Sequence, residues 1–246
     1  MVHLREALSG ERPLIGLWAS IPSPLTAEAA AAAGAAYVVV DQQHGAVDPS
    51  GMVGMLQAIA AGGAPSMVRV AANDPFVIGH ALDLGAHGVI VPMVEDGAAA
   101  LRAVAACRYA PDGVRSFGAL RGGAAGVAPV CLVMVETRAG LERVDEIAAT
   151  PGLDGIYIGP SDLALSLGLQ PTLRLEHPPV LEAIERVRAA CDARGLLCGL
   201  HCLAAEDAAE QAGRGGFALV TAGGDMRYLQ QALAVALDAA HGRAGS

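Results

Sequence analysis

The segment Val130-Cys-Leu-Val-Met-Val-Glu136 carries the plainest signature of the fold. Its first six residues are apolar and several are β-branched, which predicts a short strand buried on both faces, as in a parallel sheet. Parallel strands need crossovers between them, and these are usually helices. We therefore expect the chain on both sides of residues 130–136 to alternate between short apolar strands and longer helices.

The alternation extends along the whole chain. Glycine often closes a helical stretch just before the next strand, as at Gly34, Gly85, Gly152 and Gly195, and this is the C-cap chemistry of a repeating strand–helix unit. The predicted strands are Leu14–Ala19, Tyr37–Val40, Ser66–Val70, Gly88–Val91, Val130–Val135, Gly155–Ile158, Leu196–Leu200 and Ala218–Thr221. The predicted helices are Thr26–Ala33, Pro49–Ala60, Pro75–Leu84, Asp96–Cys107, Arg138–Ala148, Pro179–Ala193, Ala205–Ala212 and Asp225–Ala240.

Eight strand–helix units in 246 residues predict a (β/α)8 TIM barrel. A doubly wound sheet that binds a dinucleotide would need a glycine fingerprint after its first strand, and the turn Ser20-Ile-Pro-Ser-Pro24 lacks one. No linker or change of composition divides the chain, so we expect a single domain over residues 1–246.

The chain contains no lysine: its 16 basic residues are all arginine, against 25 acidic ones, and the formal net charge is −9. Without a lysine amine, Schiff-base chemistry, pyridoxal-phosphate chemistry and a Walker A nucleotide site are excluded. Enolate chemistry in this chain would need a metal ion or fixed dipoles instead. The acidic balance argues against a nucleic-acid or anionic-membrane partner.

The five cysteines lie mostly in apolar segments, which predicts reduced, buried thiols and a cytoplasmic location. The first residues lack the apolar core of a signal peptide, and no run of eighteen uncharged apolar residues predicts a membrane span.

Polar residues follow nearly every predicted strand, where a barrel carries its chemistry. Because the C-terminal ends of barrel strands meet at one rim, we expect these residues to surround a single site. They are Asp41 to Gly45, Arg69, Glu95, Glu136, the turn Gly159-Pro-Ser-Asp162, His201 and the turn Gly223-Gly-Asp225.

Glu136 and Asp162 are the candidate metal ligands. A carboxylate directly after an apolar strand is costly unless it is paired or binds a metal. Taken singly, Glu136 could pair with Arg115 or Arg138, and Asp162 could cap a helix. Together, on adjacent strands, they offer hard oxygen ligands suited to Mg²⁺ or Mn²⁺. The free N–H groups of Ser161 and Asp162 at a helix start would suit a substrate carboxylate.

The other candidates each have two interpretations. Arg69 could form a structural ion pair, or its planar fork could hold a carboxylate or an enolate oxygen. His44 could be an exposed loop histidine, or a general base whose tautomer is fixed by Asp41. His201 could bind zinc with its neighbouring cysteines, although a histidine that lines a pocket explains this segment better.

These motifs together resemble the metal-dependent class II pyruvate aldolases of the 2,4-dihydroxyhept-2-ene-1,7-dioate aldolase family, relatives of the citrate lyase β subunit. They occur in the family's order and span nearly the whole chain. They are Gly16-Leu-Trp18, Val40-Asp-Gln-Gln-His-Gly45, Val68-Arg69, Val91-Pro-Met-Val-Glu95, Arg115-Ser-Phe-Gly118, Val133-Met-Val-Glu-Thr137 and Gly155-Ile-Tyr-Ile-Gly-Pro-Ser-Asp-Leu163.

The resemblance implies a modified TIM barrel with a divalent metal, Mg²⁺, Mn²⁺ or Co²⁺, held by Glu136 and Asp162. It implies that His44 and Asp41 form the acid/base pair and that Arg69 holds the pyruvyl group and its enolate. It also implies a homo-oligomer built from dimers, often hexameric, whose last helix swaps between subunits. The implied substrate-binding residues are Arg69, Gly159, Pro160, Ser161 and Asp162, and we add His201.

Three features depart from the family pattern. Many relatives have Glu where this chain has Gln43, and a longer stretch where it has the Gly- and Ala-rich segment Ala119–Ala128. His201 occupies a position where relatives often have a small or apolar residue. The segment and His201 concern the end of the pocket distant from the metal, and so the aldehyde.

The predicted function is reversible aldol cleavage of a 4-hydroxy-2-oxo acid into pyruvate and an aldehyde, in the setting of aromatic compound catabolism. His44, or a metal-bound hydroxide that it orients, would take the C4 hydroxyl proton. The C3–C4 bond would then break, and Arg69 and the metal would stabilise the enolate. The alternatives are oxaloacetate-type decarboxylation, a CoA-ester lyase on the same barrel, and a non-catalytic barrel that binds a keto acid.

Overall fold

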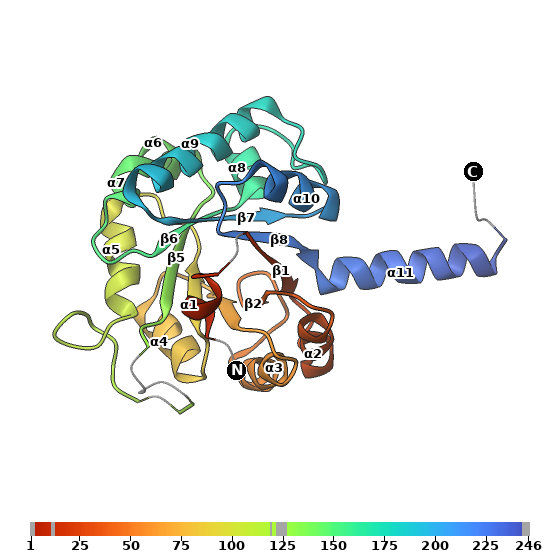
Figure 1. Cartoon of the computed structure of the whole chain (residues 1–246), viewed down its shortest axis with the longest axis horizontal. Coiled ribbons are helices and arrows are strands. Elements are labelled where there is room, and N and C mark those ends of the chain that lie inside the picture. Colours follow the sequence, from red (N-terminus) through yellow and green to blue (C-terminus); the bar gives the residue numbers. More distant parts are fainter. Residues whose placement is uncertain (1–2, 11–12, 119, 122–126, 243–246) are drawn as a thin grey trace.

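A computed structural model describes residues 3–10, 13–118, 120–121 and 127–242. Its centre is a closed barrel of eight parallel strands in sequence order, with the helices around it (Figure 1). The predicted (β/α)8 barrel is therefore confirmed. The short segment Ala119–Ala128, which the sequence singled out, lies partly outside the described residues. The strands are β1 (Leu14–Ala19), β2 (Tyr37–Asp41), β3 (Ser66–Arg69), β4 (Gly88–Val91), β5 (Val130–Val135), β6 (Gly155–Ile158), β7 (Leu197–Cys202) and β8 (Leu219–Gly224).

The helices differ from the predicted set in three places. The segment Arg138–Ala148 forms two helices instead of one, because the backbone at Arg143, with a ψ of 19°, leaves the helical region. The short helix α1 is additional, and α8 is the helix whose start the sequence predicts at residues 159–162 without giving its end. The helices are α1 (Leu4–Ala7), α2 (Pro24–Ala32), α3 (Pro49–Ala61), α4 (Pro75–Asp83), α5 (Gly97–Ala106), α6 (Arg138–Glu142), α7 (Val144–Ala148), α8 (Pro160–Ser166), α9 (Pro178–Arg194), α10 (Ala205–Arg214) and α11 (Asp225–Ala240).

The barrel interior follows the two-residue period of its strands. Val39 on β2 and Met134 on β5 belong to the cluster inside the barrel, whereas their neighbours along each strand pack against the surrounding helices. A buried polar layer crosses the interior, where the Tyr37 hydroxyl lies 3.0 Å from Thr221 Oγ1 and 3.2 Å from the Tyr157 hydroxyl. These hydroxyl groups satisfy one another, so the interior is a packed core below the C-terminal rim.

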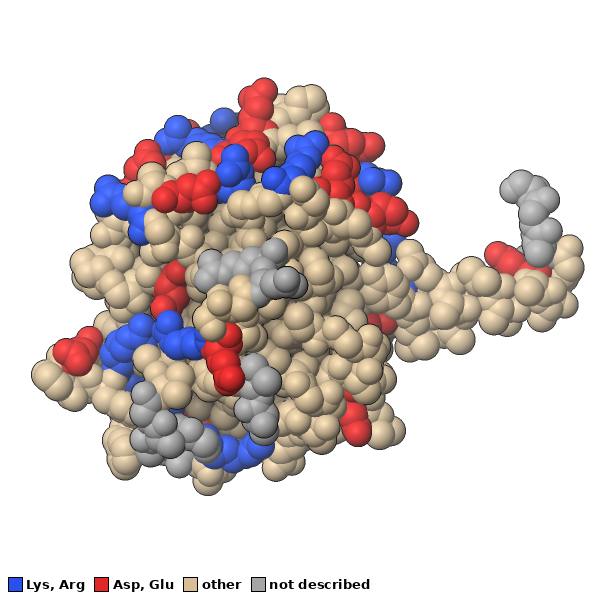
Figure 2. All heavy atoms as spheres, in the orientation of Figure 1, with Lys and Arg blue, Asp and Glu red and all other residues tan. Residues whose placement is uncertain are grey.

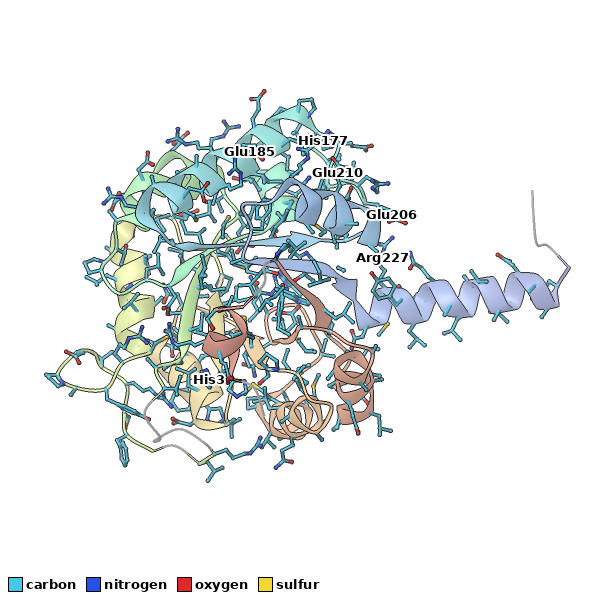
Figure 3. The ribbon with its side chains drawn as sticks, in the orientation of Figure 1. His3, His177, Glu185, Glu206, Glu210 and Arg227 are labelled. Atoms are coloured by element: carbon cyan, nitrogen blue, oxygen red, sulfur yellow. The ribbon has the colours of Figure 1, made fainter. Side chains whose placement is uncertain are left out.

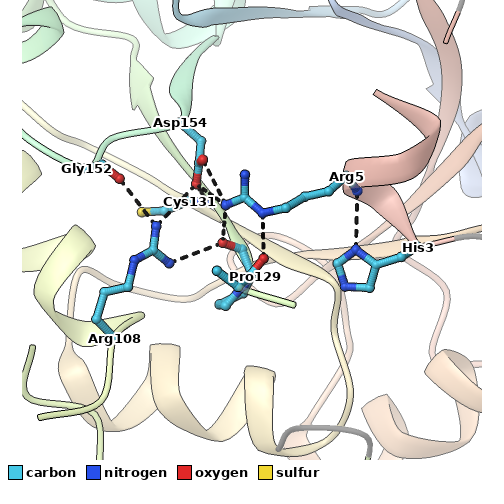
Figure 4. Close-up of polar contacts among 8 residues, drawn as sticks. His3, Arg5, Arg108, Pro129, Cys131, Gly152 and Asp154 are labelled. Carbon is cyan, nitrogen blue, oxygen red and sulfur yellow. Dashed lines mark hydrogen bonds and ion pairs between the residues drawn. The ribbon is translucent and has the colours of Figure 1, made fainter. Parts of the chain in front are cut away.

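Helix α1 closes the opposite, N-terminal end of the barrel. The Arg5 guanidinium donates to the carbonyl oxygens of Ala128 at 2.6 Å and Pro129 at 2.8 Å, and it pairs with Asp154 at 2.8 Å (Figure 4). Leu4 and Leu8 join the interior cluster from below. Helix α1 therefore covers the N-terminal end, and the predicted site residues lie at the C-terminal rim.

Helix α11 projects away from the barrel (Figure 1). None of its residues is buried, and within the described part of the chain Asp225 and Tyr228 of its first turn make the hydrogen bonds that fasten it to β1 and β8. In the described ranges, no helix has the length and apolar character needed to span a bilayer.

Candidate active site

Four predicted site residues continue the inward-facing positions of their strands. Asp41 follows Val39 by two residues on β2, and Arg69, Glu136 and His201 extend β3, β5 and β7 in the same phase. A period of two residues therefore places all four at the mouth of the barrel. The strand register also pairs Asp41 directly with Arg69 across β2 and β3.

Asp41 and Arg69 form a buried ion pair with two parallel hydrogen bonds. Arg69 Nε donates to Asp41 Oδ1 at 2.8 Å, and Nη2 donates to Oδ2 at 2.6 Å. Burial alone would raise the pKa of Asp41, but the hydrogen bonds and charge of Arg69, with a smaller contribution from Trp18, hold that pKa below its usual value. The carboxylate thus stays ionised and fixes the plane of the guanidinium.

This pairing differs from the predicted contact between the Asp41 carboxylate and the His44 imidazole. Asp41 Oδ1 accepts the backbone N–H groups of Gln43 at 3.1 Å and His44 at 3.4 Å, so it shapes the loop that carries His44. A Cβ atom at Gly45 would lie 2.2 Å from the Asp41 carbonyl oxygen, which explains why the turn needs glycine there. The His44 side chain is exposed at the rim and, among the described residues, has no hydrogen-bond partner.

Trp18 is a site residue that the sequence interpretation missed. Its ring lies 5.1 Å from the Arg69 guanidinium carbon and 4.7 Å from the His201 ring. The indole thus covers Arg69 and joins it to His201 on the other side of the barrel mouth. The sequence did contain a signal for this residue. Trp18 follows Gly16, an inward-facing position, by two residues near the end of β1, so the two-residue period of a strand makes Trp18 face inward too.

Glu136 is a buried carboxylate with one unused oxygen. Oε1 accepts the backbone N–H of Met93 at 2.8 Å, whereas Oε2 is buried and has no partner within the described part of the chain. Met93 has a φ of 56°, which is a strained conformation for a residue other than glycine. This backbone conformation directs its N–H group toward Glu136. Gly159 leaves the necessary space, since a Cβ there would lie 2.7 Å from Oε2.

The electrostatics of Glu136 show which charges surround it. Burial raises its pKa, the Met93 N–H lowers it, and the Asp162 charge raises it further; Arg69 and Asp41 act with opposite, smaller effects. The two predicted metal ligands, Glu136 and Asp162, are therefore close enough to repel each other. Their surroundings include both members of the buried ion pair.

The simpler interpretations of these two carboxylates do not match the structure. Arg115 pairs with Asp83 at 2.6 Å, and the Arg138 side chain bonds the Leu167 carbonyl at 3.4 Å, so neither neutralises Glu136. Helix α8 has Gly159 at its N-cap and no side-chain capping bond, and Asp162 lies inside its first turn. The N–H groups of Ser161 and Asp162 have no acceptor in the described ranges.

His201 is a neutral imidazole at neutral pH. Burial and the nearby Arg69 charge lower its pKa to about 4, against a smaller opposing effect of Asp41. Its cysteine neighbours belong to the apolar core outside the barrel, so they do not form a zinc site with it. All five cysteines are free and buried, as predicted.

An open hollow of about 290 Å³ lies over the ion pair, between the barrel mouth and the start of α11. It is wide enough for a small organic acid, and its floor consists of Asp41 and Arg69. The lining residues are Trp18, Ser20, Asp41, Arg69, His201, Leu203, Gly224, Met226, Arg227 and Gln230.

The comparison with known families agrees with this fold. The HpcH/HpaI aldolase/citrate lyase model matches residues 14–232, and the chain belongs to that family. It is 40% identical over 229 residues, 89% of this chain and 87% of the relative, to a hydroxypyruvate/pyruvate aldolase of Rhizorhabdus wittichii. It is 35% identical over 207 residues, 80% of each chain, to a 5-keto-4-deoxy-D-glucarate aldolase of Salmonella paratyphi A.

A solved structure supports the same conclusion. An HpcH/HpaI aldolase/citrate lyase family protein from Burkholderia cenocepacia superposes with a TM-score of 0.86 at 35% identity, over 96% of this chain and 98% of that one. The chain is therefore an enzyme, a carbon–carbon lyase of the aldolase type. The predicted resemblance is confirmed at the level of this broad family.

Proposed function

We propose that this chain catalyses the reversible, divalent-metal-dependent cleavage of a 4-hydroxy-2-oxo acid into pyruvate and an aldehyde. The observation that carries the proposal is Glu136 Oε2, a buried carboxylate oxygen with no partner among the described residues. It lies within electrostatic reach of Asp162, Arg69 and Asp41. A buried acceptor of this kind is stabilised when a cation occupies the space in front of it.

The residues present fit a divalent cation. Glu136 and Asp162 supply two hard oxygen ligands, and Gly159 leaves the space beside Oε2 open. The described ranges contain no group of three or more acidic, histidine or cysteine side chains that could hold a metal alone, so substrate and water oxygens would complete the ligand set. When bound, Mg²⁺, Mn²⁺ or Co²⁺ would polarise the 2-oxo group and offset the charge of the enolate oxygen.

The chain's own groups account for the rest of the reaction. Arg69 uses Nε and Nη2 to bind Asp41, so Nη1 is available to the 2-oxo acid and to the enolate formed from it. The free N–H groups of Ser161 and Asp162, beside Gly159 and Pro160, are assigned to the substrate carboxylate. His201 would line the same pocket as a neutral donor or acceptor.

We assign the proton transfer to His44. It would take the proton of the C4 hydroxyl as the C3–C4 bond breaks, and the enolate would then be protonated at C3 to give pyruvate. His201 is the poorer base, because a pKa near 4 leaves it too weakly basic at neutral pH. Asp41, which pairs with Arg69, also accepts the backbone N–H of His44, and this supports a position for His44 near the C4 end of a substrate held at Arg69.

The relatives' names include pyruvate, hydroxypyruvate and 5-keto-4-deoxy-D-glucarate, so both pyruvate and hydroxypyruvate are suitable donors to test. The branch that acts on 2,4-dihydroxyhept-2-ene-1,7-dioate, and with it aromatic compound catabolism, stays our prediction for the cellular role.

The test is turnover with and without metal. Protein stripped with EDTA should lose cleavage and condensation activity and regain them with Mn²⁺, Mg²⁺ or Co²⁺. Glu136→Gln should weaken metal binding in calorimetry while the protein stays folded, whereas the exposed Glu142→Gln is the matched control. Full activity of metal-free protein, or unchanged metal affinity in folded Glu136→Gln, would overturn the proposal.

A further inference from the structure

Arg227 is a half-buried arginine without a counterion in the described part of the chain. It lies in the first turn of α11, close to Glu206 of α10 (Figure 3), yet no ion pair or hydrogen bond joins it to Glu206 or to another described residue. A cation in the first turn of a helix also opposes the helix dipole. Helix stability therefore gives no reason for an arginine at this position.

The position of Arg227 relates it to the candidate active site. It lines the hollow of about 290 Å³ whose floor is Arg69 and Asp41, and also a second hollow of about 290 Å³ beside α10. Arg69 is neutralised by Asp41, whereas Arg227 forms no ion pair with any described residue. In a chain of net charge −9, it places an unneutralised positive charge at the outer end of the cavity.

The arginine is held there by contacts within its own chain. Asp225 accepts the backbone N–H groups of Ser20 at 2.9 Å and Ile21 at 3.1 Å, which fastens the start of α11 to the end of β1. The Tyr228 hydroxyl donates to the Ala222 carbonyl at 2.6 Å, which fastens the same turn to β8. The backbone of Arg227, between these two anchors, is therefore fixed at the rim.

We propose that Arg227 binds an anionic group at the aldehyde end of the substrate, so that the enzyme selects acceptor aldehydes that carry a carboxylate or a phosphate. This inference rests on the proposed function, because it takes the 2-oxo acid end to lie at Arg69. The tail of the substrate then runs outward past Trp18 and His201 to Arg227. A guanidinium with free N–H groups matches either anion.

Binding is tested first, because it does not depend on turnover. The probes are 2-oxoadipate and 2-oxohexanoate, which have the same carbon chain and differ in whether the tail ends in a carboxylate. Calorimetry with Mn²⁺ present measures both dissociation constants in the parent enzyme, Arg227→Gln, Arg227→Lys and the control Arg186→Gln, an exposed arginine on α9. Loss of one charge-assisted hydrogen bond should reduce the preference for 2-oxoadipate about ten-fold in Arg227→Gln.

Arg227→Lys should keep part of the preference and Arg186→Gln all of it. Pyruvate condensation then separates the two anions: succinate semialdehyde is compared with butanal, and glyceraldehyde 3-phosphate with glyceraldehyde. If Arg227→Gln loses the preference for succinate semialdehyde over butanal, the bound anion is a carboxylate. If it loses the preference for glyceraldehyde 3-phosphate over glyceraldehyde, the bound anion is a phosphate. An unchanged preference in that variant, in both binding and condensation, would overturn the inference.

The two proposals fail in distinguishable ways. An enzyme that cleaves 4-hydroxy-2-oxo acids but shows the same tail preference with and without Arg227 retains the proposed function and loses this inference. A protein that binds 2-oxoadipate through Arg227 but turns over no substrate retains the anion site and loses the proposed function.

Discussion

Asp41 serves two purposes with one carboxylate. Both of its oxygens bind the Arg69 guanidinium, and Oδ1 also accepts the backbone N–H groups that shape the His44 loop. The charged group that would hold the 2-oxo acid and the loop that would carry the base are therefore positioned by the same side chain. A change at Asp41 should disturb both, whereas a change at His44 should disturb only the second.

Asp41→Asn should weaken substrate binding as well as catalysis. Asparagine has one acceptor oxygen and presents an NH₂ group to the N–H groups of Arg69, so the guanidinium loses its charge partner and one hydrogen bond. We expect pyruvate affinity to fall by about ten-fold or more, with a loss of unfolding free energy of about 3 kcal/mol. Calorimetry with metal present and urea unfolding measure the two effects.

The contrast with His44→Ala makes this test specific. That variant should lower kcat by about 10²–10⁴ and leave pyruvate affinity within about a few-fold. Asp48→Asn is the control for Asp41→Asn, because Asp48 is exposed on the same loop and accepts only local hydrogen bonds. If Asp41→Asn kept the parental pyruvate affinity, the ion pair between Asp41 and Arg69 would have no role in pyruvate binding.

The predicted contact between Asp41 and His44 relied on their closeness along the chain, and strand register placed Asp41 beside Arg69 instead. Both residues end adjacent strands in the inward phase, so the pair was in principle readable once β2 and β3 were aligned. Trp18 was readable in the same way. The strained backbone at Met93 was not, because its conformation depends on a contact with Glu136, 43 residues away.

At the scale of elements, the strands were the most predictable part of the molecule. Every strand core lies where the sequence predicts it, because apolar segments of four to six residues between helices fit a doubly buried parallel sheet. The break at Arg143 and the short helix α1 were not predicted. Helix α1 is too short to form alone and depends on the contacts of Arg5 below the barrel.

His87, at the N-terminal end of the barrel near α1, should make the stability of the protein depend on pH. Burial and the neighbouring His3 lower the pKa of His87 to about 4, and its Nδ1 accepts the Ser66 N–H at 3.2 Å. The unfolded chain gains a proton at His87 near pH 6.5, which the folded chain does not take up until about pH 4. The stability present above pH 6.5 is therefore lost as the pH falls toward 4.

His87→Asn isolates this contribution. The Asn Oδ1 atom can replace Nδ1 as the acceptor for Ser66, but it does not titrate. Urea midpoints from pH 7.5 down to pH 4.5, each scaled to the value at pH 7.5, should fall less steeply in the variant than in the parent. His201 and the carboxylates titrate in both proteins, so their effects cancel in the difference. Parallel curves would show that His87 is not held neutral in the folded state.

At the scale of the whole molecule, contacts within this chain do not account for the stability of helix α11. It has 16 residues, none of them buried, and a 16-residue helix without tertiary packing is only marginally stable in water. Figure 2 shows its surface almost free of charged side chains. Leu229, Leu233 and Leu237 share one face at helical spacing and are 46%, 54% and 58% exposed.

We propose that this leucine face packs against another copy of the chain, in a dimer-based assembly that could extend to a hexamer and could swap α11 between subunits. An apolar face of this kind is rarely left in water, and a second copy would bury it by symmetry.

Leu233→Glu should therefore lower the mass measured by light scattering, or aggregate the protein, because a charge in the contact is left unpaired. Gln231→Glu adds the same charge on the other side of the helix, about 160° around the axis from Leu229 and from Leu233, and should keep the parental mass. Arg227 lies roughly opposite Leu229 and Leu233 around the helix axis, so burial of the leucine face would leave the anion site open. A parent protein that is monomeric at micromolar concentration with α11 still helical would contradict this arrangement.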